Sequence, residues 1–595
     1  MKNRIHPNWS DIRALKQPLP QGVMQFAEKL DQILPEEWYI YVRPIYNGHK
    51  PDLCIFNESY GVTFIHVSEL TTENLEPLYE KIQTSHGVVK RKIFIKNNNP
   101  DEKIIHPTSV AESYSDELKM VYVPLMYYAI LKGEKKWTIV KSAVYYCNVD
   151  SQDGEPLFRD NKGFVKSFFK DSTDDQLIQA ILPKSDTNEY KLEGDWIPRI
   201  KSWIFPSYHS VEEGTFIELS NDQERDAKPT PKKHIRTRGV AGGGKTLVLA
   251  QRAARLAAID KKVLIITFNI TLIHYIKHHI ERSPYPFDRQ NITIRHFHGF
   301  CRDYLEENYI PWPKEGGQEV LDNGVAFLVK DLLQRGINKN GRKYDAVLID
   351  EGQDIEGSWY HCLCQFLTEN DELFLIVDDR QNLYNRKSSW IDAPRDVKFR
   401  GKWRSLKSNY RIPPNLVKIV NLFAELYLGN VGDKIVCAQQ LELAYLNNDF
   451  EWDNVANLMQ AIEKSYQIYN RLIHTAGVKP EDIAILLCTH KEGKALVKYF
   501  DAKKVDLHHI FGNQGLKYAF DWYNKQSKAS TIHSFKGWEI PNVIIISPAE
   551  NVRVHGDLSH ILYVAMTRSR GNLFVINQRS EYADFGEKVK GLEDK

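Results

Sequence analysis

A glycine-rich segment that ends in a lysine and a threonine is the strongest chemical signal in the sequence. It reads GVAGGGKT at residues 239–246 and lies between a strand-like and a helix-like pattern. In G-x-x-x-x-G-K-[ST], backbone N–H groups surround phosphate oxygens, the lysine reaches the β- and γ-phosphates, and the hydroxyl binds Mg²⁺. The sequence therefore predicts a nucleotide phosphate loop. Its predicted binding residues are Gly239, Gly242, Gly243, Gly244, Lys245 and Thr246.

Two strand-like runs with acidic or polar ends follow this loop. The first, YDAVLIDEGQD at residues 344–354, contains Asp350 and Glu351 where its apolar part ends. At such a position we expect the aspartate to bind Mg²⁺ through water and the glutamate to activate the attacking water. The second, LFLIVDDRQNLY at residues 373–384, contains Gln381, which is suited to sensing the γ-phosphate. With the glycine-rich loop, these residues predict hydrolysis of ATP with Mg²⁺.

These segments resemble the nucleotide site of superfamily 1 helicases of the UvrD/Rep type, and the resemblance extends over residues of about 215–580. LKSNYR resembles motif IV, which implies that Tyr410 stacks on the adenine and that Arg411 is an arginine finger on the γ-phosphate. LYVAMTRSR resembles motif VI and implies a second finger, Arg568. TIHSFKGWE resembles motif V, and LSNDQERDA resembles the Q motif. The residues that these two segments place at the ribose and at the adenine edge are Glu539 and Gln223, respectively.

The resemblance also implies a track for single-stranded nucleic acid. TFN at residues 267–269 resembles motif Ia, and HFHGF resembles the adjoining T-x-H segment, with His296 in the place of the usual threonine. Aromatic side chains such as Phe268, Phe297 and Tyr384 are suited to stacking on bases. The predicted nucleic-acid contacts are Thr267, Phe268, Asn269, His298, Tyr384, Thr531 and His533.

An ATP-dependent helicase or translocase that moves 3′→5′ on single-stranded DNA is the activity that the resemblance implies. About 50 residues separate His298 from Asp350, and about 120 separate Arg411 from Thr531. The UvrD type carries large accessory insertions in these two intervals, so both insertions are reduced here, and motif III lacks the usual Trp-Arg-Gly continuation. Two alternatives stay open. One is an active nuclease–helicase that acts on foreign phage or plasmid DNA in antiviral defence, and the other is an ATP-switched nucleic-acid-binding protein that does not unwind.

The expected cofactors are ATP and Mg²⁺, and the expected partner is single-stranded or partly duplex DNA, with RNA and an accessory protein as open possibilities. The net charge is only +2, so a nucleic-acid surface must be a local basic patch. Seven scattered cysteines without CxxC spacing favour a reducing cytoplasm over a disulfide framework or a zinc site. No apolar run approaches the roughly 18 residues that cross a bilayer, so we expect no membrane partner.

A second group of candidate residues precedes the helicase-like segments. Glu28 lies on a helix-like pattern, Asp52 precedes an apolar run, and GVTFIHVSEL at residues 61–70 reads as a buried strand. This order resembles a PD-(D/E)xK nuclease fold of the nuclease-related domain (NERD) type, in which acids gather metal and activate water. His66 and Ser68 stand where the Glu and Lys of E-x-K belong. We favour a domain that no longer cleaves over a rearranged site of Glu28, Asp52 and His66, because metal nucleases need converging carboxylates.

These residues need a multidomain α/β fold to position them. A chain of 595 residues allows roughly three or four domains, and strand–helix alternation after the first 230 residues predicts parallel sheets with crossover helices. The stretch 221–238, with two prolines and six basic side chains, is predicted to be a connector. The alternation predicts helices over 246–260, 271–281, 491–502 and 559–570. We expect a PD-(D/E)xK nuclease-like α/β domain over 1–215 and two RecA-like parallel-sheet domains with reduced accessory insertions over 216–400 and 401–585, the last with a small insertion at about 430–480.

Overall fold

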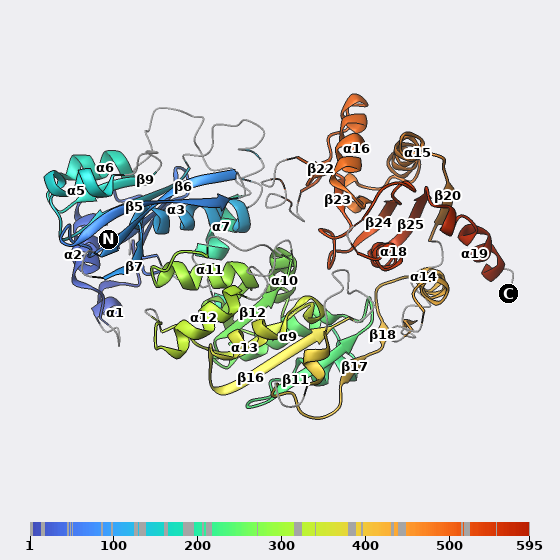
Figure 1. Ribbon diagram of the computed structural model, residues 1–595, viewed down its shortest axis with the longest axis horizontal. Helices are drawn as coiled ribbons and strands as arrows, with labels where there is room; N and C mark the ends of the chain where they lie inside the picture. Colours follow the sequence, from blue (N-terminus) through green and yellow to red (C-terminus); the bar gives the residue numbers. More distant parts are fainter. Residues whose placement is uncertain are drawn as a thin grey trace. The chain divides into compact units, whose positions relative to one another are not determined.

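The structure, a computed structural model, is a mixed α/β fold with several parallel sheets (Figure 1). The chain forms two compact units: unit 1 comprises Met1–Ser207 and His298–Arg342, and unit 2 comprises Tyr208–Phe297 and Lys343–Lys595. In the described ranges, no helix is both long enough and apolar enough to span a bilayer. The structure describes residues 4–13, 18–44, 47, 49, 51–84, 87–96, 99–123, 126, 129, 139–159, 165–181, 196–204, 208–209, 217–269, 272–313, 324–338, 341–378, 388–393, 397–429, 434–437, 448–512, 516, 520, 524–554 and 556–593.

A mixed sheet of order β1-β2-β3-β4-β8-β9 forms the centre of unit 1. Strands β2, β3 and β4 are antiparallel neighbours, whereas β4, β8 and β9 run parallel. Helix α2 packs on one face, where Ile65 and Val67 of β4 join its apolar cluster, and α3 packs against β4 and β8. Because both faces are covered, β4 is buried along its whole length. The bounds are β1 (Ile5–His6), β2 (Tyr39–Val42), β3 (Leu53–Asn57), β4 (Gly61–Ser68), β8 (Val140–Tyr146), β9 (Val165–Phe169), α2 (Gln21–Ile33) and α3 (Pro107–Glu117).

The chain returns to unit 1 after His298, in the interval where the UvrD type carries its first accessory insertion. Asp303, on α11, lies with its carboxylate 3.8 Å from His49 Nε2. Tyr309 packs against the apolar cluster that contains Phe94 and Tyr146. The reduced insertion is therefore part of the core of unit 1, which the sequence did not predict. The remaining elements of unit 1 are α1 (Trp9–Arg13), an antiparallel sheet of β5 (Leu75–Thr84), β6 (Gly87–Lys96) and β7 (Asn99–Ile105), and α5 (Ser151–Phe158), α6 (Asp174–Ile181), α7 (Trp196–Ile204), α11 (Phe297–Glu307) and α12 (Val325–Gln334).

A parallel sheet of order β14-β12-β15-β16-β11-β17 carries the glycine-rich loop in unit 2, and we call it and its helices the first lobe. All neighbouring strands run parallel, so their carboxyl ends meet at one edge of the sheet. The helices α9, α10 and α13 follow β11, β12 and β15 in the chain (Figure 1). The bounds are β11 (His234–Gly239), α9 (Lys245–Ala258), β12 (Val263–Thr267), α10 (Leu272–Glu281), β13 (Phe287–Asp288), β14 (Ile292–His296), β15 (Tyr344–Ile349), α13 (Gly357–Cys364), β16 (Leu367–Val377) and β17 (Arg404–Leu406).

A second parallel sheet, of order β20-β25-β24-β21-β23-β22, forms the second lobe of unit 2. Residues 450–470, inside the predicted insertion of about 430–480, supply β20 and α15 to this lobe: β20 pairs with β25 from Phe450 opposite Leu573 onward. The bounds are β18 (Ser408–Asn409), α14 (Pro414–Tyr427), β19 (Val436–Cys437), β20 (Phe450–Asn454), α15 (Leu458–Asn470), β21 (Ile483–Leu487), α16 (His490–Ala502), β22 (His508–His509), β23 (Lys528–Thr531), β24 (Ile540–Ile546), α18 (Leu558–Met566), β25 (Ser569–Asn577) and α19 (Phe585–Glu593).

Two predicted segments differ from the structure. The predicted connector 221–238 contains the helix α8 (Asn221–Ala227) and most of β11. A capping box explains the helix: the Ser220 side chain accepts from Gln223 N while the Gln223 side chain accepts from Ser220 N. The predicted helix 559–570 ends at Met566, because Ser569 already pairs with Ile540 in the second sheet.

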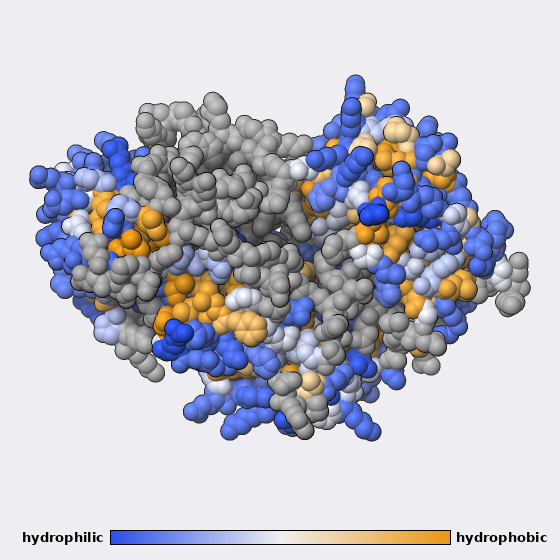
Figure 2. Space-filling model, in the orientation of Figure 1, coloured by the Kyte–Doolittle hydropathy of each residue, from blue (hydrophilic) through white to orange (hydrophobic). Residues whose placement is uncertain are grey.

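The described surface that Figure 2 shows is mostly hydrophilic, with separate apolar patches. Large apolar side chains that remain exposed are spread over both units, as is common for folded proteins. They are Leu78, Ile259, Phe327, Ile337, Leu426, Val436 and Met459.

Candidate active site

Two glycines of the glycine-rich loop have positive φ angles and neighbours that leave no room for a side chain. Gly242 has φ +74°, and a Cβ there would lie 1.9 Å from Asn409 Oδ1. Gly244 has φ +75°, and a Cβ there would lie 2.6 Å from Gln223 Nε2. Tyr410 N donates to Gly242 O at 3.0 Å. Only glycine combines this backbone with this proximity, so both positions require glycine.

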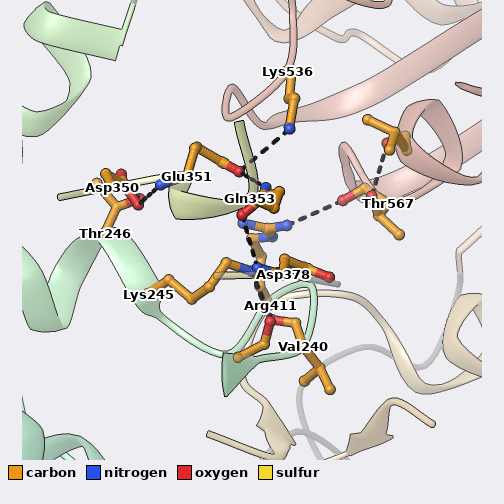
Figure 3. A network of polar contacts seen from close by, with 12 residues as sticks. Val240, Lys245, Thr246, Asp350, Glu351, Gln353, Asp378, Arg411, Lys536 and Thr567 are labelled. Carbon is orange, nitrogen blue, oxygen red and sulfur yellow. Dashed lines mark hydrogen bonds and ion pairs between the residues drawn. The ribbon is translucent and has the colours of Figure 1, made fainter. Parts of the chain in front are cut away.

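Lys245 opens α9 and turns back over the loop. Its Nζ donates to the carbonyl oxygens of Gly239 and Val240, each at 3.1 Å, and to Asp378 Oδ2 at 2.7 Å (Figure 3). The ammonium group is thus fixed at the mouth of the loop by oxygens that phosphate oxygens would replace.

Thr246 and Asp350 offer a pair of oxygen ligands beside Lys245. Thr246 Oγ1 donates to Asp350 Oδ2 at 3.1 Å, and Glu351 N donates to Asp350 Oδ1 at 3.0 Å. Burial and the neighbouring Glu351 charge raise the pKa of Asp350, while Lys245 opposes this rise. Hydroxyl and carboxylate oxygens are ligands that a hard cation such as Mg²⁺ accepts, so these residues fit the expected ion.

Glu351 is held in an unusual backbone conformation at the end of β15. Its φ is +53°, a region that costs a non-glycine residue about 1–3 kcal/mol and is common at functional sites. Gln353 Nε2 donates to its carboxylate, and Lys536 Nζ lies 3.6 Å away. Burial alone would raise the pKa of Glu351, but the charges of Lys536, Lys245 and Arg568 outweigh it and lower the pKa. The carboxylate is therefore ionised and able to accept a proton.

The second lobe brings cations to this edge of the first lobe. Lys536 Nζ lies 2.6 Å from Asp354 Oδ2, and both side chains are buried. Arg411 donates to Glu539 and, at 3.1 Å, to Thr567 O. Figure 3 shows Lys536 directed toward Glu351 and Arg411 joined to Thr567 by a hydrogen bond.

Arg568 is as buried as Lys536. Its guanidinium donates to Val564 O at 2.9 Å and to Thr567 Oγ1 at 2.8 Å. Burial and the charge of Arg411 lower the pKa of Arg568 to about 10, so it remains charged at neutral pH.

Gln223, predicted at the adenine edge, sits against the loop. Its Nε2 donates to Gly243 O at 3.1 Å. The structure therefore brings the predicted residues Gln223, Lys245, Thr246, Asp350, Glu351, Tyr410, Arg411, Glu539 and Arg568 to the facing edges of the two lobes. Gln381 and Tyr384 lie outside the described residues.

The predicted nucleic-acid residues differ in accessibility. The side chains of Thr267 and Thr531 are buried, whereas Phe268, Asn269, His298 and His533 are half-buried. Their contacts with nucleic acid stay a prediction. The prediction that Phe297 stacks on bases is wrong. Its side chain is buried, and its ring is stacked on that of Trp359 with 4.1 Å between centroids. Phe297 therefore packs in the core.

Four contributors were missed by the sequence reasoning: Gln353, Asp354, Asp378 and Lys536. Gln353 joins the two acidic strand ends, because its Oε1 accepts from Asp378 N at 3.0 Å while its Nε2 holds Glu351. All four lie in segments that the motifs had already singled out. For Gln353 and Asp354 the available signal was their polar character next to Asp350 and Glu351, but the pairing of Lys536 with Asp354 depends on tertiary structure.

The candidate nuclease residues form a pair rather than a triad. Asp52 Oδ2 lies 2.9 Å from His66 Nδ1 and accepts from Val67 N at 2.8 Å. His66 Nε2 is buried without a hydrogen-bond partner among the described residues. Glu28, Asp52 and His66, all described, do not form a group that could hold a metal ion.

Asp52→Ala is expected to lower the free energy of unfolding by about 1–3 kcal/mol, because the Val67 N–H and the His66 ring would stay buried without their acceptor. Denaturant unfolding, followed by the loss of secondary structure, measures this change. Glu73→Ala removes an exposed carboxylate of the same unit and should change stability by less than about 0.5 kcal/mol. Equal stability of the two variants would show that the Asp52–His66 pair contributes nothing to the fold.

At one edge of the sheet in the first lobe, a glycine-rich loop and an acidic strand end meet, as they do in phosphate-loop proteins. The family model of the UvrD/REP helicase N-terminal domain matches residues 219–316, and that of the UvrD-like helicase C-terminal domain matches residues 527–576. These matches support a superfamily 1 helicase of the UvrD/Rep type, which implies nucleic-acid-dependent ATPase or helicase activity. Neither match reaches the residues before 219, so the nuclease-related resemblance stays a prediction.

A solved structure described as "The structure of PRRSV helicase" is similar at 13% identity and a TM-score of 0.30, covering 60% of this chain and 55% of that chain. The chain thus spans about half the length of that protein, and a likeness of this size carries no functional argument. No curated protein matches the sequence.

Proposed function

We propose that the protein is an ATP-driven translocase or helicase that moves 3′→5′ on single-stranded DNA. The observation that carries this proposal is the buried Glu351 carboxylate of the first lobe, which lies 3.6 Å from Lys536 Nζ of the second lobe and whose pKa the charges of Lys536 and Lys245 lower. A hydrolytic site built from both lobes makes each turnover a relative motion of the lobes. The two family matches support the coarser part of this proposal, a superfamily 1 helicase.

Each residue has a role that follows from its position. Lys245 binds the β- and γ-phosphates once they replace its present oxygen partners, and Thr246 and Asp350 would hold Mg²⁺, which supplies charge neutralisation. Glu351 takes the proton of the attacking water. Arg411 and Arg568 stabilise charge on the transferred phosphoryl group. Both arginines now have other partners, which they must leave to reach the phosphate.

Lys245→Ala is expected to abolish phosphate release that is stimulated by single-stranded DNA, with a loss of at least about a hundredfold. Release is measured with a coupled assay, with and without an unstructured oligonucleotide. Lys262→Ala, an exposed lysine of the same lobe, is the matched control and should retain wild-type turnover. Stimulated release by the Lys245→Ala protein would overturn the proposal.

Strand displacement separates a motor from an ATP-switched binding protein. A 3′-tailed duplex should be unwound and a 5′-tailed duplex should not, and RNA-tailed substrates extend the same gel to RNA. ATP hydrolysis without displacement or translocation would support the switch, which the inclusion of the short interval 298–342 in unit 1 favours.

Unit 1 is proposed as a nuclease-related platform that no longer cleaves. The Asp52–His66 pair, whose members do not form a metal-holding group with Glu28, supports this. Mg²⁺- or Mn²⁺-dependent cleavage that disappears in Asp52→Ala would instead support an active nuclease–helicase. We place the protein in the cytoplasm, where its seven free cysteines would stay reduced.

A further inference from the structure

A surface rich in basic side chains lies at one edge of the sheet in the first lobe, and we call it the basic edge. Two segments form it, residues 232–238 (KKHIRTR) and 397–407 (VKFRGKWRSLK), which contain nine basic and no acidic side chains. Because the whole chain has a net charge of only +2, all other residues together carry −7. The basic members are Lys232, Lys233, Arg236, Arg238, Lys398, Arg400, Lys402, Arg404 and Lys407.

The fold brings these two segments side by side. Strand β17 is the outermost strand of the sheet and pairs with β11 from Thr237 opposite Arg404 onward. A bridge between His234 and Phe399 extends the contact toward the amino end of β11. Figure 1 shows β11 and β17 next to each other. Because β11 has 6 residues, the basic edge extends over about 20 Å.

Trp403 fixes two of the arginines of the basic edge. The guanidinium carbon of Arg238 lies 4.2 Å from the centroid of the Trp403 ring, and that of Arg236 lies 4.9 Å from it. The Trp403 indole donates to Asp392 Oδ1 at 2.8 Å, and Arg236 donates to the same oxygen at 2.7 Å. Because such cation–π contacts are favourable, Trp403 holds two guanidinium groups in place and is not a bare platform for bases.

Acidic neighbours neutralise only part of the basic edge. Arg404 lies 3.1 Å from Asp226 in an ion pair. Lys398 lies 2.7 Å from Asp371, and Asp392 pairs with both arginines at the tryptophan. The other five basic side chains are exposed and form no ion pair with a residue that the structure describes. They are Lys232, Lys233, Arg400, Lys402 and Lys407.

Protection of the sheet edge explains only part of this pattern. Lysines on an edge strand prevent its association with another sheet, and Lys402 and Lys407, which flank β17, fit that role. Lys232 and Lys233, however, precede β11, which is an inner strand because β16 and β17 lie on its two sides. Basic residues at that position protect no edge, so the surface as a whole fits a polyanion.

The phosphate backbone of duplex DNA is the polyanion that fits this surface best. A duplex carries one negative charge per about 1.7 Å of its length, or about twelve over the basic edge. Protein partners are bound through an apolar centre, but none of the exposed large apolar side chains found in the described ranges belongs to the two segments. Single strands are bound by stacking on aromatic rings, whereas Trp403 is engaged by arginines.

We propose that the basic edge is a second nucleic-acid site, which binds the backbone of duplex DNA without regard to its sequence. It is separate from the predicted single-strand contacts at Thr267–Asn269, because β15, β16 and β11 lie between β12 and β17 in the sheet. Four strand spacings amount to about 19 Å. The inference goes beyond the proposed function: it assigns the duplex to one side of the first lobe and the single strand to the other.

A triple variant, Lys232→Gln with Lys233→Gln and Lys402→Gln, tests the inference because it removes three exposed charges that no described acid neutralises. Fluorescence anisotropy of a labelled blunt duplex is measured without ATP over a series of KCl concentrations. We expect the association constant at low salt to fall at least about tenfold. The slope of its logarithm against the logarithm of the salt concentration should become shallower by about two to three, as for three lost phosphate contacts.

The matched control is the triple variant Lys261→Gln with Lys262→Gln and Lys343→Gln. These lysines lie at the surface of the same lobe, before β12 and β15, and we expect the control to keep the wild-type salt slope. Equal losses in both triple variants would show a general effect of net charge and overturn the inference. A basic-edge variant that self-associates in light scattering but binds the duplex like the wild type would assign these lysines to edge protection and also overturn it.

Two further measurements separate the other occupants. Phosphate release stimulated by an unstructured single strand should stay at the wild-type level in the basic-edge variant. Lost stimulation with unchanged duplex affinity would place these lysines on the single-strand track and overturn the inference. Poly-glutamate that binds more tightly than the duplex, with binding lost in the variant, would assign the surface to an acidic protein. A wild type that binds the duplex but whose ATP hydrolysis does not respond to single strands would overturn the proposed function and leave the inference intact.

Discussion

Arg411→Ala is expected to lower kcat for DNA-stimulated ATP hydrolysis by about 10³-fold, the effect typical of a lost arginine finger. Arg411 lies at the facing edges of the lobes, where it donates to Glu539 and to Thr567 O. In the proposed function, Arg411 leaves these two partners to reach the γ-phosphate. The measurement is phosphate release at saturating ATP and single-stranded DNA.

Two further variants define the role of this guanidinium. Arg411→Lys keeps the charge but loses the planar fork, so its kcat should lie between those of the wild type and Arg411→Ala. Arg471→Ala removes an arginine of the second lobe whose 2.6 Å ion pair with Glu451 is exposed, and kcat should change by less than about twofold. A wild-type kcat in Arg411→Ala would rule out its role as a finger.

The elements that carry the site could be predicted because their signals are local. Alternating apolar strands and amphipathic helices mark a parallel sheet, and residues after such strands must meet at one edge. This is why Lys245, Thr246 and Asp350, up to about 100 residues apart in the chain, could be expected to lie together, and the structure joins them.

Contacts between the lobes could not be predicted in the same way. Lys536 and Asp354 are 182 residues apart, and nothing in either segment specifies the partner. Phe297 shows the same limit: an aromatic next to a predicted nucleic-acid contact reads as a stacking platform, yet Trp359 covers it. The helix α8 was missed because the prolines and lysines that follow it, at residues 228–233, outweighed its capping box.

In unit 1, the sequence predicts a buried strand but not the segments that cover it. The strand that contains His66 was predicted correctly, since β4 covers residues 61–68. Its burial on both faces, however, comes from α2 and α3. The interval 298–342 packs into unit 1 through contacts such as that of His49 with Asp303. Periodicity reports which residues are buried, not which distant segment buries them.

Lys536→Met is expected to change both stability and the pH dependence of turnover. Asp354 would remain buried without its cation, which costs about 3–5 kcal/mol for a broken buried pair. Lys536 is also the largest of the charges that lower the pKa of Glu351 against burial. Its loss should raise that pKa, so the acidic limb of the kcat profile should move to higher pH, because Glu351 must be ionised to accept a proton.

The lowered pKa of Glu351 also determines how the stability of the protein changes with pH. A carboxylate whose folded-state pKa lies below its unfolded value contributes stability that is present above the unfolded value and is lost as pH falls through the folded value. The wild type should therefore lose the Glu351 contribution only in acid, and Lys536→Met should lose it at higher pH. Denaturant unfolding across an acidic pH series measures this difference.

Lys528→Met separates the two effects of removing a buried lysine. Lys528 is equally buried in the second lobe, but its Nζ donates to the carbonyl oxygens of Glu481 and Asn524. We expect this variant to lose stability without moving the acidic limb of the kcat profile. If both lysine variants left that limb in place, Lys536 would be a structural tie between the lobes and not the cation that keeps Glu351 ionised. If only Lys536→Met moved it, the second lobe would control the proton acceptor of the first.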